Sequence, residues 1–195
     1  MKKIILLLLF ITIFAFIGVR LAAFSALRLP QQAHKALSSV QVVTPTPSLG
    51  QPMTLRIPKL NIQAPIESVG LTSTGRMDVP KTVGGTGWYA YGPKPGEVGN
   101  AVIDGHFDTP TGAPSVFYYI GNLHPGDTIQ VVTTHHQTLT FTVTKVTSFP
   151  DNGFPIEEVF GASSSKNLNL ITCSGMWDRT AHNYSNRTVI FSTLQ

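Results

Sequence analysis

The chain has 195 residues, a formal net charge of +4 and a single cysteine. The charge is modest and no basic stripe is interleaved with aromatic residues, which argues against a nucleic-acid partner. One cysteine excludes an intramolecular disulfide. The fold must therefore rest on a hydrophobic core, for which residues 53–195 are long enough.

Residues 1–28 have the pattern of a membrane segment. Two lysines at positions 2 and 3 precede an apolar run from Ile4 to Val19. As a helix this run would cover about 24 Å, short of the roughly 30 Å hydrocarbon core of a bilayer. Arg20 can extend its charge toward the headgroups while the apolar residues up to position 27 complete the span. We predict a transmembrane helix here, with the rest of the chain outside the cytoplasm.

A cleaved signal peptide is the competing interpretation of this segment. Ala23 and Ser25 are small residues at the spacing that a signal peptidase recognises. Either interpretation places the following residues on the outer side of the membrane.

Residues 29–52 differ from the segments on both sides. They lack hydrophobic periodicity and contain Pro45, Pro47 and Pro52, so we predict an extended linker. The remaining residues, 53–195, have the length of one domain.

This domain consists of short β-prone runs separated by glycine and proline. In residues 138–144, Leu139, Phe141 and Val143 alternate with threonines, the pattern of a strand with one buried face. Strands this short and numerous predict a mainly β fold, a closed barrel or a sandwich. Two stretches, APSVFYYIGNL and FPIEEVFG, predict short helices or turns. The strand-like runs are MTLRIP, NIQAPIESVG, NAVIDG, TIQVVTT, QTLTFTVTKVTSF, LNLITC and RTVIFSTL.

Cys173 ends the apolar run LNLITC. A lone cysteine can be a small buried hydrophobic residue. At the end of a strand beside a histidine, it can instead be a nucleophile that forms a thioester, with the imidazolium protonating the leaving amine.

Two of the six histidines are candidate partners for Cys173. His106 follows the strand-like NAVID through Gly105, a residue that allows a sharp exit from a strand. His182 lies after Cys173 and is the rival. The adjacent His135 and His136 lack a nearby cysteine or carboxylate at metal-ligand spacing. We expect the other four to be solvated residues of the linker and loops: His34, His124, His135 and His136.

An arginine is the expected stabiliser of the oxyanion in such a reaction. Arg187 opens the run RTVIFSTL, and residues 174–186 could form a loop that lets this run pair beside LNLITC. Arg179, within the same loop, is the alternative.

These motifs resemble those of sortases, the membrane-anchored cysteine transpeptidases of Gram-positive bacteria. NLITC is similar to the family's Thr-Leu-x-Thr-Cys signature, with Asn169 where threonine is usual. GHFDT resembles the segment that holds the catalytic histidine, and NRTVIF the strand that carries the arginine. Longer stretches resemble class F, including GWYAYGPKPGEVGNAVIDGH, SVFYYIGNLHPGDTIQV and GMWDR.

The resemblance implies an eight-stranded sortase β-barrel with short helices over residues 53–195. It implies that Cys173 is the nucleophile, His106 the general acid and base, and Arg187 the residue that stabilises substrate and oxyanion. The expected substrate is an LPXTG-type sorting signal, cleaved between threonine and glycine. The acyl group would pass to an amine of a lipid-linked cell-wall precursor or a pilin lysine.

The resemblance implies no metal or organic cofactor. For a calcium site, residues 150–166 offer only Asp151, Glu157 and Glu158, too few acidic ligands.

Two other functions are compatible with parts of the sequence. An exported L,D-transpeptidase also uses a cysteine and a histidine, but its cysteine normally follows Ser-His-Gly, which LITCSG does not supply. A non-catalytic, membrane-anchored binding module would need Cys173 only for packing, and its thiol would be shielded.

Overall fold

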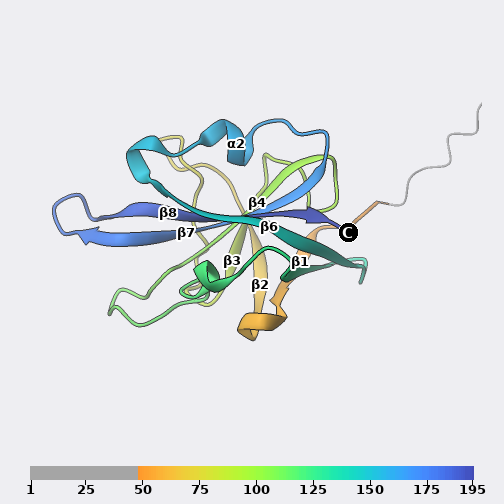
Figure 1. Ribbon diagram of the computed structural model, residues 1–195, viewed down its shortest axis with the longest axis horizontal. Helices are drawn as coiled ribbons and strands as arrows, with labels where there is room; N and C mark the ends of the chain where they lie inside the picture. The colour runs from red at the N-terminus through yellow and green to blue at the C-terminus, as the bar shows by residue number, and fades with distance from the viewer. Residues whose placement is uncertain (1–47) are drawn as a thin grey trace, which may run out of the picture. The chain divides into compact units, whose positions relative to one another are not determined.

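The computed structural model describes residues 48–195 (Figure 1). The predicted transmembrane helix in residues 1–28 lies outside these residues, as does nearly all of the linker predicted for residues 29–52. Between residues 48 and 195, no helix is long and apolar enough to cross a bilayer.

Eight strands close into a barrel, as the resemblance implied. Their order around the barrel is β1-β2-β3-β4-β7-β8-β6-β5. The pairs β2-β3 and β4-β7 are parallel, and the other neighbours are antiparallel. The strands are β1 (Pro52–Ile57), β2 (Ile62–Val69), β3 (Thr86–Tyr89), β4 (Gly99–Gly105), β5 (Thr128–Thr133), β6 (Thr138–Pro150), β7 (Lys166–Asp178) and β8 (Asn183–Leu194).

The helical elements are short. The stretches APSVFYYIGNL and FPIEEVFG contain the 3-10 turn η2 (Ile120–Asn122) and helix α2 (Ile156–Phe160), as expected. Two further 3-10 turns follow β1 and β6, namely η1 (Pro58–Leu60) and η3 (Asp151–Gly153). Figure 1 shows α2 outside the ring of strands.

The barrel wall has apolar side chains on both faces where α2 covers it. Inside the barrel, Ala101 and Ile103 of β4 and Leu168 and Leu170 of β7 belong to the main core. The alternate residues of the same strands face outward. Val102 of β4, Ile171 of β7 and Val189 of β8 pack beneath Val159 of α2 in a second cluster.

This alternation determines which side chains lie on the outer face of the barrel beyond α2. Side chains along a strand point to opposite faces in turn, so every second residue shares a face. After Val102 and Ile171, the next outward positions are Asp104 on β4 and Cys173 on β7. Before Val189 on β8, the next one is Arg187.

The connection between β7 and β8 differs from the predicted loop. Both strands continue past Cys173 and Arg187, and the turn occupies only residues 179–182. Arg187 therefore lies within β8 and does not begin it. Gly175, with φ +83°, sits at the register shift between Ser174 and Trp177. In Figure 1 this blue hairpin extends well beyond the end of the barrel wall.

Gly105 ends β4 against the buried ring of Phe117. A Cβ atom there would lie 2.6 to 2.9 Å from three ring atoms of Phe117, which is fully buried. We expect Gly105→Ala to lower the free energy of unfolding by about 1 to 3 kcal/mol, because neither ring nor backbone can move freely. Urea denaturation of the full-length chain measures this loss.

Gly121→Ala is the matched control, since its Cβ would meet a single atom of Thr188 at 4.0 Å. Equal denaturation midpoints for the two variants would show that the tight packing at Gly105 does not constrain the end of β4.

Candidate active site

Strand pairing brings the three predicted site residues into one row. Cys173 of β7 is directly opposite Arg187 of β8 in the antiparallel register. On the other side of β7, β4 runs parallel to it, with Asp104 beside Ile171. His106 lies two residues after Asp104, as Cys173 lies two residues after Ile171, so the two are brought to the same level. Thr172 Oγ1 donates to the carbonyl of Gly105 at 2.8 Å, which ties the end of β4 to β7 next to the histidine.

A cleft of about 770 Å³ lies along this row, and His106, Cys173 and Arg187 all line it. Its walls come from the segment after β2, from η3 and the residue that follows it, and from helix α2. They are largely apolar away from the row, with side chains of Leu71, Met77, Val79, Phe154, Ile156 and Phe160.

His106 is held by its ring and by its backbone. Its Nε2 lies 2.9 Å from the carbonyl oxygen of Pro80, and its own carbonyl accepts the N–H of Phe117. Because a carbonyl oxygen can only accept, Nε2 carries the proton in this contact. Nδ1 is then the nitrogen available for proton exchange.

Arg187 is held by three hydrogen bonds and one ion pair from its two terminal nitrogens. Nη1 donates to the carbonyls of Tyr184 and Asn186, at 3.1 and 2.8 Å. Nη2 donates to Asn183 Oδ1 at 2.7 Å and forms an ion pair with Asp151 Oδ1 at 3.0 Å. With this side chain 13% exposed, the guanidinium is fixed, and two of its five N–H groups, Nε–H among them, make no hydrogen bond in residues 48–195.

Asp151 supports Arg187 from a distant part of the sequence. Its Oδ1 also pairs with Arg76 at 3.0 Å, and its Oδ2 accepts Asn183 Nδ2 at 2.9 Å. In the sequence, Asp151 is only one of the three acidic residues that are too few for a calcium site, and nothing there indicates this pairing.

The thiol of Cys173 is half-buried. Burial raises its pKa above the ordinary value, Arg187 opposes this increase, and Asp108, Asp104 and Asp151 add to it. A raised pKa keeps most of the thiol protonated at neutral pH. The positive charge of Arg187 thus favours the thiolate.

The rival residues lie away from the row. His182 and Arg179 are exposed in the turn at the tip of the β7-β8 hairpin. His124 is in a turn before β5, and His135 and His136 are at the tip of the β5-β6 hairpin, as expected. His34 lies outside the described residues.

Asp104 is a feature of the cleft that the sequence did not indicate. Burial is the largest cause that raises its pKa, to about 8, with Asp78 and Glu67 adding to the effect. Its Oδ1 is buried without a hydrogen-bond partner in residues 48–195. The carboxyl is therefore largely neutral at pH 7 and can donate a hydrogen bond at the cleft wall.

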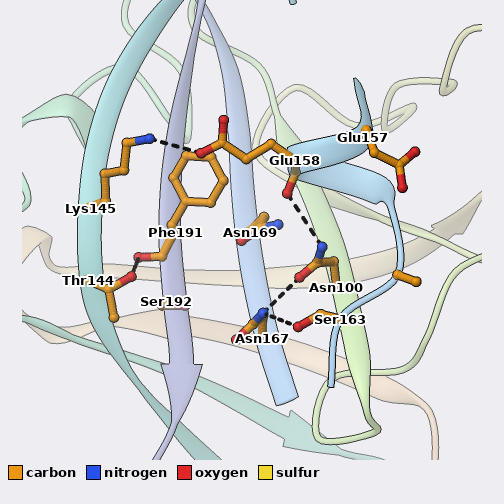
Figure 2. A pocket seen from close by; sticks show the side chains of 11 residues that line it. Asn100, Thr144, Lys145, Glu157, Glu158, Ser163, Asn167, Asn169, Phe191 and Ser192 are labelled. Atoms are coloured by element: carbon orange, nitrogen blue, oxygen red, sulfur yellow. Dashed lines mark hydrogen bonds and ion pairs between the residues drawn. The ribbon is translucent and has the colours of Figure 1, made fainter. Parts of the chain in front are cut away.

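A second hollow of about 400 Å³ lies farther along the same outer face, beyond α2 (Figure 2). It contains none of the predicted site residues. Asn169 donates to the carbonyl of Val159 in α2 at 2.8 Å, and Asn100 to that of Gly161 at 2.9 Å. Asn169, which replaces the usual threonine of the sortase signature, thus anchors the helix. These contacts give the second hollow a structural role.

Within the part of the chain that the structure describes, no group of three or more His, Cys, Asp or Glu side chains is arranged to hold a metal ion.

The environment of Cys173 predicts how its thiol reacts. Alkylation by iodoacetamide should reach half its maximal rate at a higher pH than for a free cysteine peptide, because burial raises the pKa of the thiol. Arg187→Gln should shift the profile to still higher pH, because it removes the charge that favours the thiolate. The measurement is the alkylation rate of the full-length chain across pH.

Arg179→Gln is the control, because it removes the same charge from the exposed hairpin turn. A profile at lower pH than that of the free peptide, or equal shifts in the two variants, would contradict this description of the site.

Comparisons with known proteins identify the family and the fold. The family model described as the Sortase domain matches residues 55–195. Among solved structures, sortase C-1 from Actinomyces oris is 20% identical over 73% of this chain and 71% of that chain, with a TM-score of 0.57. A lid mutant of sortase A from Corynebacterium diphtheriae is also 20% identical, over 74% and 69%, with a TM-score of 0.57.

Sortase C1 from Streptococcus agalactiae is 17% identical over 73% of this chain and 66% of that chain, with a TM-score of 0.57. Comparison with curated protein sequences gives no match. The structural similarities, at these identities, show a shared fold, and the family match covers nearly all the described residues. The chain belongs to the sortase family and is a cysteine transpeptidase.

Proposed function

We propose that this sortase cleaves an LPXTG-type sorting signal between threonine and glycine and transfers the acyl group to an amine. The observation that carries the proposal is the row of His106, Cys173 and Arg187 along one cleft. Because the chain is a sortase, we retain neither the L,D-transpeptidase nor the binding module.

The apolar part of the cleft supports this class of substrate. The leucine and proline of the signal are apolar, and burying such side chains stabilises a complex by roughly 25 cal/mol per Å² removed from water. Leu71, Val79 and Ile156 are exposed in the free protein and line the cleft. They provide the surface on which the first residues of the signal would pack.

In the first half of the reaction, the Cys173 thiolate attacks the carbonyl carbon of threonine. The C–N bond then breaks, and His106 donates a proton through Nδ1 to the departing glycine amine. Because the pKa of Cys173 is raised, only a minority of molecules holds the thiolate at neutral pH. The same molecules must also carry a protonated His106.

Arg187 has a narrower role than a free guanidinium would have. Three of its five N–H donors are hydrogen-bonded within the protein, which leaves two, Nε–H among them, to stabilise the oxyanion or hold the substrate backbone. A donor fixed in advance need not reorganise when charge develops in the transition state.

Several features of the proposed function rest on the sequence alone. These are the class F assignment, the Gram-positive source and the retained transmembrane helix in residues 1–28. The same applies to an extracellular catalytic domain and to a lipid-linked peptidoglycan precursor or pilin lysine as acceptor.

A fluorogenic Leu-Pro-x-Thr-Gly peptide tests the proposed function directly. We expect the full-length chain to cleave it between threonine and glycine, and Cys173→Ala to abolish cleavage because no other thiol is present. The product masses identify the cleaved bond. Unchanged turnover in Cys173→Ala would exclude Cys173 as the nucleophile.

The histidine assignment makes a separate prediction. His106→Ala should slow acylation about 100-fold or more, the scale of lost acid-base catalysis. His182→Ala should have little effect, since His182 is exposed in the hairpin turn. Single-turnover rates of peptide cleavage compare the two variants, and the reverse ranking would move the role to His182.

A further inference from the structure

A second surface lies next to Cys173, on the other side of the β7-β8 hairpin from the cleft. Asn183 and Arg187 of β8 line the cleft, whereas Tyr184 does not. Because side chains alternate along a strand, the side chain of Tyr184 lies on the opposite face of β8 from those of Asn183 and Arg187. Tyr184 pairs with Trp177 of β7. Its side chain therefore faces the segment that follows β4.

Asp108 of that segment binds Tyr184. The Tyr184 hydroxyl donates to Asp108 Oδ2 at 2.5 Å, and this bond is the largest cause that raises the pKa of Tyr184, to about 12. The phenol therefore stays protonated. Within residues 48–195, Asp108 has no cationic partner, and its Oδ1 accepts no hydrogen bond.

The carboxylate is electrostatically close to the reacting sulfur. Asp108 is the first of the three aspartates that raise the pKa of Cys173, and a charge on Cys173 in turn raises the pKa of Tyr184. Asp108 also lies two residues after His106 in the chain. An unpaired carboxylate here opposes formation of the thiolate, so it hinders the first half of the reaction.

Tyr184, the partner of this carboxylate, belongs to an aromatic cluster. Phe107 stacks on Tyr118 with ring centroids 4.5 Å apart, and Tyr184 lies 5.4 Å from Phe107 and 5.1 Å from Trp177. Trp177 is 49% exposed, so this aromatic surface is open to solvent. Aromatic faces attract ammonium groups, and their apolar area packs against alkyl chains.

We propose that Asp108, Tyr184 and this aromatic surface bind the ammonium group of the acyl acceptor. This inference rests on the proposed function. It assigns the two substrates to opposite sides of the hairpin, with the sorting signal in the cleft and the amine beside Asp108. The negative charge of Asp108 hinders the first half of the reaction, because it opposes the thiolate. In the second half, the same charge attracts the incoming ammonium group.

The second half then balances as follows. The bound ammonium gives one proton to His106, which is neutral after protonating the leaving glycine. The free amine attacks the thioester carbon, a C–N bond forms and the C–S bond breaks. The second proton lost from nitrogen passes to the Cys173 sulfur, which leaves the thiol, the imidazolium and the new amide.

Two nucleophiles of different charge test this assignment. The diamine 1,5-diaminopentane carries two ammonium groups at neutral pH, whereas hydroxylamine is uncharged. Asp108→Asn keeps an acceptor for Tyr184 and removes the charge. We expect it to raise the KM of the full-length chain for the diamine about tenfold or more, the effect of losing one ion pair.

The KM for hydroxylamine should stay within about twofold. Acylation by the peptide without an amine should become faster, because Asp108 opposes formation of the Cys173 thiolate. Tyr184→Phe, which leaves Asp108 less firmly held, should raise the KM for the diamine by a smaller factor. Glu157→Gln is the control, because it removes one exposed charge from α2, away from this surface.

The outcomes separate this inference from the proposed function. If the wild-type chain cleaves the peptide and Asp108→Asn leaves the KM for the diamine unchanged, the acceptor site is wrong. An equal rise in KM for both nucleophiles in Asp108→Asn would show that the Asp108–Tyr184 bond has only a structural role. That result would also overturn the inference. A wild-type chain that cleaves no sorting-signal peptide would contradict both proposals.

Discussion

The antiparallel pairing of β7 with β8 is the constraint on which the site depends. It places Cys173 opposite Arg187 on the outer face of the barrel. Because side chains alternate, a shift of one residue in either strand would turn one of the two toward the core. The apolar residues on both faces prevent such a shift, since Leu170 must face the interior and Ile171 must face α2. The packing that stabilises the barrel thus also fixes the geometry of the site.

The pairing of β7 with β8 also places charged groups around the Cys173 thiol. Burial and three aspartates favour the protonated thiol, and Arg187 favours the thiolate. Asp151 is part of this opposition, yet it also holds Arg187 in place through an ion pair at 3.0 Å. Asp108 has no such structural partner charge in the described residues, which is why we assign it to the incoming amine. Both carboxylates lower the fraction of Cys173 that is thiolate in the free enzyme. In exchange, Asp151 holds Arg187 in place, and Asp108 binds the acceptor amine in our proposal.

The sequence predicted the elements that have a buried face, and their patterns show why. Phe141 and Val143 alternate with threonines on β6, and both are buried in the core. The strand β3 was missed because its four residues, Thr86–Tyr89, are too short to show a period. The extension of β7 and β8 was missed because its residues are mostly polar and only partly buried, so they show no apolar alternation to detect. The roles of Asp151 and Asp108 depend on contacts between segments far apart in the chain, which single-sequence patterns do not record.

A trapped acyl-enzyme tests the central claim, that the register of β7 and β8 makes Cys173 the reacting group. The full-length chain is mixed with a sorting-signal peptide without an amine and quenched in acid, and its intact mass and proteolytic fragments are measured. The account predicts a mass increase equal to the peptide's acyl portion ending in threonine, located on Cys173. Cleavage of the peptide with the acyl group on another residue, or with no adduct at any time point, would contradict it.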